Sequence, residues 1–205
     1  RARVVPPSAH SQELIAFDAV QRDTFPCYTS WTPTDPQWNQ ATRGYKHAGL
    51  GIRSTARHAA PAYLASYTAT LKHCAEIDTS YQWEGNDPES GIGKCLLAFN
   101  SAVAEGDRMP TQAMPEAPSR QQKLSFAVDN AQHLAFEASL SADDKKHLKS
   151  ETLPGASQFL EATPSKDLNL AWDATEFVTE IRVRLLDNLF PADAWCPACD
   201  CVLDR

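Results

Sequence analysis

The stretch that most constrains the fold is a glycine turn that runs directly into a long helical segment, residues 49–63 (GLGIRSTARHAAPAY). Glycine tolerates positive φ angles and close approach of the backbone. Gly49 and Gly51 therefore indicate a sharp change of chain direction between packed elements. Ser54 or Thr55 is suited to cap the helix that follows, because a hydroxyl accepts a hydrogen bond from a free backbone N–H of the first turn.

Apolar side chains recur at helical spacing along most of the chain, and no convincing strand alternation is present. The pattern predicts an all-α fold, an irregular multi-helix bundle with long loops. Within it, Pro26 should stop the first helix, and Pro61 should kink the helix after the glycine turn or delay its start. The expected helices cover about residues 11–25, a short segment around Trp38 and Ala41, the segment after Ser54, 91–104, 120–140, a segment from Ser141, a short segment after Pro154, and a segment from Asp173.

Two helical patterns give finer expectations. Leu14, Phe17, Val20 and Phe25 lie roughly on one face of the first helix, so we expect that face to be buried. The sequence from Asp173 to Glu176 is typical of a capping box.

Proline content suggests where the chain divides. Three prolines in residues 106–119 predict a linker between a first helical region, 1–105, and a second one, 120–190. The remaining segment, 191–205, carries a cysteine cluster.

Composition limits the function classes. The net charge of −7 argues against a protein whose whole surface binds nucleic acid or anionic membrane. No run of about 18 apolar residues is present, so no transmembrane segment is expected. The six cysteines are too sparse for a disulfide scaffold, which favours a reducing, intracellular compartment.

The charges are unevenly distributed along the chain. Residues 36–75 contain no acid, whereas residues 76–117 are strongly acidic. Cations near a helix start are suited to bind phosphate. The sequence therefore predicts a nucleic-acid-binding surface made by Arg43, Lys46, Arg53 and Arg57. The alternative is that these cations form ion pairs with the acids of 76–117 or with a partner protein.

Cys196 and Cys199 form a C-x₂-C pair, which is one half of a tetrahedral zinc site. Cys201 offers a third thiol, but no histidine follows His147. Zinc is thus a candidate cofactor at an incomplete site, and the alternative is a group of free thiols. No catalytic constellation is visible elsewhere: Asp143-Asp144 is expected on a solvated helix start, and Gly91 to Lys94 fails the phosphate-loop pattern.

Several short motifs follow one another in a definite order: Phe17-Asp18, Trp38-Asn39-Gln40-Ala41, Ala48-Gly49-Leu50-Gly51-Ile52-Arg53-Ser54, His58 to Ser66 (HAAPAYLAS), Lys123-Leu124-Ser125 with Asp129, Pro154-Gly155-Ala156, and Cys196-Pro197-Ala198-Cys199. This order resembles the region downstream of the polymerase domain in non-LTR-retrotransposon-type reverse transcriptases, especially a divergent set from protists. The resemblance implies a thumb-like region over 1–105 and the start of a zinc-binding segment over 191–205. It also implies that a parent protein would be an RNA-directed DNA polymerase.

The chain departs from that family in two ways that bear on function. Ala48 stands where the family usually has a first glycine, and the polymerase Asp-Asp motif is missing. We therefore expect a non-catalytic helical module that contacts nucleic-acid backbone. The alternative is a non-catalytic structural subunit of a larger protein assembly. A stand-alone enzyme is the weakest interpretation, because no paired carboxylates, triad or complete metal set supports it.

Overall fold

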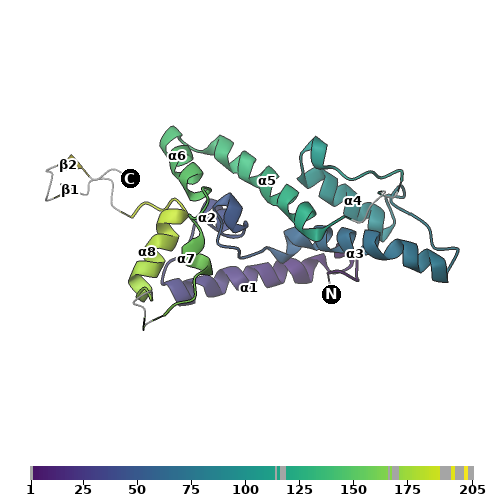
Figure 1. The fold of residues 1–205 in the computed structure, drawn as a ribbon, viewed down its shortest axis with the longest axis horizontal. Helices are drawn as coiled ribbons and strands as arrows, with labels where there is room; N and C mark the ends of the chain where they lie inside the picture. Colours follow the sequence, from purple (N-terminus) through teal and green to yellow (C-terminus); the bar gives the residue numbers. More distant parts are fainter. Residues whose placement is uncertain are drawn as a thin grey trace. The chain divides into compact units, whose positions relative to one another are not determined.

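The computed structural model describes residues 2–113, 115, 119–165, 167 and 171–189, and the backbone of 195–196 and 201–202. The described chain is helical, which confirms the all-α prediction (Figure 1). The α-helices are α1 (Ser11–Thr29), α2 (Asp35–Ala41), α3 (Thr55–Ile77), α4 (Gly91–Ala102), α5 (Gln121–Ser139), α6 (Ala142–Glu151), α7 (Gln158–Glu161) and α8 (Ala174–Arg184). Short 3₁₀ turns are η1 (Pro7–Ala9), η2 (Tyr45–His47) and η3 (Glu105–Asp107), and strands β1 (Trp195–Cys196) and β2 (Cys201–Val202) pair antiparallel.

The chain forms two compact units, and each combines stretches that are distant in the sequence. The first unit contains Arg1–Thr24 and Arg53–Ala135, and the second contains Phe25–Ile52 and Phe136–Arg205. The proline-rich segment 106–119 falls within the first unit. The contiguous ranges expected from the sequence stay a prediction, because compactness alone does not test where independent domains begin and end.

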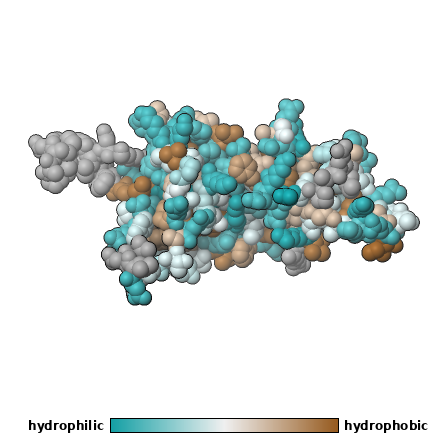
Figure 2. All heavy atoms as spheres, viewed as in Figure 1, coloured by the Kyte–Doolittle hydropathy of each residue, from teal (hydrophilic) through white to brown (hydrophobic). Residues whose placement is uncertain are grey.

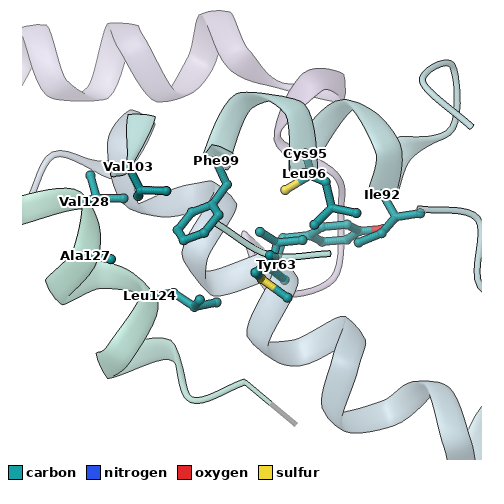
Figure 3. Packing of buried hydrophobic residues seen from close by; sticks show 11 residues of the cluster. Tyr63, Ile92, Cys95, Leu96, Phe99, Val103, Leu124, Ala127 and Val128 are labelled. Carbon is teal, nitrogen blue, oxygen red and sulfur yellow. The ribbon is translucent and has the colours of Figure 1, made fainter. Parts of the chain in front are cut away.

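The core of the first unit is built by α3, α4 and α5. Its buried members are Tyr63, Leu64, Ile92, Cys95, Leu96, Phe99, Val103, Met109, Leu124, Ala127 and Val128. Figure 3 shows Phe99 of α4 reaching toward the α5 side chains Leu124 and Ala127. Ser54 caps α3, since its Oγ accepts from the N–H of Arg57 at 3.2 Å, and Ser90 caps α4 in the same way.

The expectation that Pro26 stops the first helix is wrong, and so is the late helix start at Pro61, whereas the kink at Pro61 stays a prediction. Helix α1 continues past Pro26 to Thr29, and α3 begins at Thr55 and runs through the buried Pro61. A proline inside a helix removes one backbone hydrogen bond and costs about 3 kcal/mol. In α3 that cost is offset by burial of the face that carries Leu64 and Leu71.

The core of the second unit joins α2, the glycine turn and the end of α8. Its buried members are Trp38, Ala41, Leu50, Ile181 and Leu185. Phe25 packs edge-on against Trp38, with ring centroids 5.5 Å apart. The predicted capping box at the start of α8 is present, since Asp173 and Glu176 each accept the other's backbone N–H.

The expected buried face of α1 is only partly buried. Leu14 and Phe25 are half-buried, whereas Phe17 and Val20 are exposed. Within the residues that the structure describes, no helix is both long enough and apolar enough to cross a lipid bilayer.

Candidate functional site

The glycine turn lies in the second unit and depends on close backbone contacts. A Cβ atom at Gly49 would lie 2.1 Å from the carbonyl oxygen of Arg43, so only glycine fits there without movement of the backbone. Gly51 has a φ of 72° and faces the ring of Tyr45. Two hydrogen bonds close the turn, from Leu50 N–H to the Ala41 carbonyl (3.0 Å) and from Gly51 N–H to the Arg43 carbonyl (2.9 Å).

A buried arginine from α8 donates hydrogen bonds to backbone carbonyls in and just before this turn. The Arg184 side chain is 1% exposed and donates to the carbonyls of Gly49 (3.1 Å) and Tyr45 (3.0 Å). It also binds the Glu151 carboxylate at 2.8 Å. Burial lowers the pKa of Arg184, and the Glu151 charge opposes that shift. Gln40 adds a donor, since its amide binds the carbonyls of Ala48 (3.0 Å) and Arg184 (2.7 Å).

The start of α3 lies in the first unit, and a carboxylate from α1 occupies it. Asp18 accepts hydrogen bonds from the backbone N–H groups of Thr55 (2.7 Å) and Ala56 (3.2 Å) and from the hydroxyls of Ser54 and Thr55 (both 2.5 Å). Burial alone raises the pKa of Asp18, but these hydrogen bonds outweigh burial and hold the pKa below its ordinary value. Free N–H groups at a helix start form an anion-binding site. Here Asp18 is the anion.

A second carboxylate of the same unit, that of Asp129, lies beside Arg53, Arg57 and His58. Asp129 of α5 is 3% exposed and forms an ion pair with Arg53. His58 Nε2 lies 3.3 Å from Asp129 Oδ1 and 3.2 Å from Arg53 Nη1. Arg57 is half-buried; burial lowers its pKa, and the charges of Asp18 and Asp129 oppose that shift.

The structure therefore places the four predicted binding residues in different environments. Arg53 and Arg57 lie together beside Asp129 in the first unit, and 46% of the Arg53 side chain stays exposed. Arg43, in the second unit, is 1% exposed, and its guanidinium carbon lies 4.5 Å from the centroid of the Phe136 ring. Lys46 is exposed on η2.

The alternative, in which these cations pair with the acids of residues 76–117, is wrong for Arg53. Its partner is Asp129, which lies outside that acidic interval. Sequence reasoning also missed Arg184, Asp18 and Asp129 as members of the site. The only signal for Asp18 and Asp129 was their position in the motifs of the resemblance.

The proposed zinc ligands are Cys196 and Cys199, whose side chains lie outside the part of the chain that the structure describes. Within the described part of the chain, no three His, Cys, Asp or Glu side chains gather closely enough to hold a metal ion. Cys27, Cys74 and Cys95 are free thiols. Burial raises the pKa of Cys95 to about 12, so this thiol is protonated at neutral pH and is no nucleophile.

No protein-family model, curated protein or solved structure matches this sequence.

Proposed function

We propose that this chain is a non-catalytic helical scaffold that contributes a binding surface to a larger protein assembly. One observation carries the proposal: the charged groups at the start of α3 bind one another. The α3 N–H groups donate to Asp18, and Arg53 and His58 contact Asp129. A phosphate at this helix start would have to displace the Asp18 carboxylate from four hydrogen bonds.

Exposed apolar side chains of the first unit supply the interaction surface. Ile15, Phe17 and Val20 are all exposed within two turns of α1. Single exposed apolar residues are ordinary, but Phe17 and Val20 are three residues apart and so lie on one face of α1, where together they favour contact with another protein. Figure 2 shows apolar side chains at the surface among hydrophilic ones, a mixture that a non-permanent interface shares with the rest of a protein surface.

The test is mild purification of the chain from its source, followed by measurement of stoichiometry. We expect a partner at fixed ratio, and the Phe17→Ser/Val20→Ser variant should lose it while its circular dichroism stays unchanged. Leu153→Ser is the matched control, because Leu153 is equally exposed but lies in the second unit. A lone monomer, or a partner that both variants retain, would overturn the proposal.

Contact with nucleic-acid backbone is the second candidate, and the exposure of Lys46 and of nearly half of Arg53 favours it. It is also the function that the resemblance implies. Binding to an RNA–DNA hybrid should then weaken strongly between about 50 and 200 mM salt. Arg53→Ala should reduce the slope of log affinity against log salt by about one, whereas Arg108→Ala, an exposed arginine elsewhere in the same unit, should not. Absence of binding at both salt concentrations would exclude this candidate.

A further inference from the structure

A polar pocket in the first unit has a lining that belongs neither to the α1 surface nor to the start of α3. Its volume is about 370 Å³. The walls are formed mainly by Tyr63, Tyr67, Tyr81, Gln82, Glu84 and Ile92. The ring centroids of Tyr63 and Tyr67 are 5.9 Å apart, and those of Tyr67 and Tyr81 are 6.3 Å apart. The pocket thus combines three neighbouring aromatic rings with one carboxylate.

The sequence builds this pocket from two helices and a fixed loop. Tyr63 and Tyr67 are one helical turn apart on α3 and therefore share a face. Ile92 comes from the first turn of α4, and Figure 3 shows it beside Tyr63. Tyr81 and Glu84 belong to the loop between α3 and α4.

That loop is held in place by hydrogen bonds within it and by one hydrogen bond to Thr111. Asp78 accepts from the backbone N–H (2.9 Å) and hydroxyl (2.6 Å) of Ser80. The Trp83 indole donates to the Thr111 carbonyl at 2.9 Å, and its ring meets Tyr67 edge-on with centroids 6.0 Å apart. The Ser90 hydroxyl donates to the Glu84 carbonyl at 2.9 Å. The pocket is accordingly formed before any ligand arrives.

Among the described residues that line the pocket, Glu84 carries the one charged side chain. No cationic side chain of the described residues forms an ion pair with Glu84; Lys94 of α4 pairs with Glu89 at 3.0 Å. Burial raises the pKa of Tyr67, and Tyr81 and the Glu84 carboxylate raise it further. The Tyr67 hydroxyl is therefore neutral, and the negative charge of the Glu84 carboxylate favours a cation over an anion beside it.

We propose that this pocket binds an alkylammonium group, with the cation against the tyrosine rings and close to the Glu84 carboxylate. Aromatic rings attract a cation through their quadrupole, and a nearby carboxylate adds direct charge attraction. A lysine side chain of a partner protein and a small organic amine share this chemistry. The site goes beyond the scaffold function, because it shares no residue with the α1 surface.

The experiment is saturation-transfer NMR of the full chain with tetramethylammonium or N-acetyl-lysine-methylamide at about 10 mM, with tert-butanol as a neutral control. We expect transfer to the ammonium probes and none to tert-butanol. Glu84→Gln should weaken binding about tenfold, as should Tyr81→Ala, which removes an exposed ring. Glu105→Gln is the matched control, an exposed acid of η3 in the same unit, and should bind as the native chain does.

The two probes distinguish the source of the ligand. Transfer to N-acetyl-lysine-methylamide would assign the site to a protein side chain, and transfer to tetramethylammonium alone would assign it to a small methylated amine. Transfer to neither probe, equal transfer to tert-butanol, or affinities that Glu84→Gln and Tyr81→Ala leave unchanged would overturn the proposal. Loss of the assembly partner in the α1 variant does not affect these results, so the two proposals fail separately.

Discussion

The glycine turn and the start of α3 are consecutive in the sequence, but their backbone groups bind side chains of opposite charge. In the turn, buried Arg184 donates to backbone carbonyls that would otherwise be unsatisfied. At the helix start, Asp18 accepts from backbone N–H groups that no helical carbonyl reaches. The environments differ as well: Arg184 is 1% exposed, whereas Arg53 is 46% exposed. Both charged side chains, Arg184 and Asp18, bind backbone groups of this segment. We expect the contribution of a charged side chain to the free energy of unfolding to increase with its burial.

The largest effect should come from Arg184→Leu. The substitution leaves the Gly49 and Tyr45 carbonyls without their donor and the Glu151 carboxylate without its cation. Loss of one partner from a buried ion pair costs about 3–5 kcal/mol in the free energy of unfolding. Urea denaturation followed by circular dichroism measures this loss.

The control is Arg182→Leu, also in α8. Arg182 pairs with Asp187, but about a third of its side chain is exposed, so its loss should cost about 1 kcal/mol or less. Equal losses for the two arginines would break the link between burial and energetic weight.

Gly49→Ala should rank second. The new Cβ would lie 2.1 Å from the Arg43 carbonyl oxygen and 2.8 Å from that of Gln40, both backbone atoms that cannot rotate away. We expect a loss of about 2–3 kcal/mol, visible as a lower thermal midpoint. Gly106→Ala is the matched control, since nothing lies within 4 Å of its added Cβ, and it should change stability by less than about 0.5 kcal/mol. A neutral Gly49→Ala would mean that the turn relaxes easily.

Asp18→Asn should cost about 1–2 kcal/mol at neutral pH, because the uncharged amide is a weaker cap for α3.

The stability difference between the native chain and this variant depends on pH in a defined direction. The pKa of Asp18 is lower in the folded chain than its ordinary value, so its contribution is full above the unfolded pKa and is lost as pH falls through the folded pKa. The stability difference between native chain and variant should therefore shrink below about pH 4. A difference that is constant from neutral to acidic pH would show that the carboxylate charge is not what caps α3.

Local sequence patterns predicted the helices well because the signals for helix starts are local. Ser54, Ser141 and Asp173 precede α3, α6 and α8 as their side chains require. The partners in the site could not be predicted in this way. Arg184 lies 135 residues from Gly49 and sits in the last turn of α8, where a cation is favoured on any exposed helix.

The acid-free interval 36–75 indicated which cationic side chains belong to the site, but it did not indicate which carboxylates lie beside them. It drew attention to Arg53 and Arg57, but the acids beside them come from α1 and α5, outside the interval. A count of charges along the chain cannot show which distant carboxylate approaches. A local pattern also cannot show which face of a helix another element covers. The pattern of α1 places Phe17 and Val20 on a face expected to be buried, although both are exposed.

The smallest predicted effect, Ala48→Gly, tests the turn itself. Ala48 has a φ of 57° and is 0% exposed, so an alanine occupies a left-handed conformation in the core. That conformation costs an L-residue about 1–2 kcal/mol. Glycine removes the strain but loses a buried methyl and adds freedom to the unfolded chain, so we expect a net change near zero.

Ala41→Gly deletes an equally buried methyl from the right-handed helix α2, gains no relief, and should cost about 2 kcal/mol. Equilibrium unfolding of the two variants measures this difference, to which relief of the left-handed conformation at Ala48 should contribute most. If both cost the same, Ala48 is unstrained.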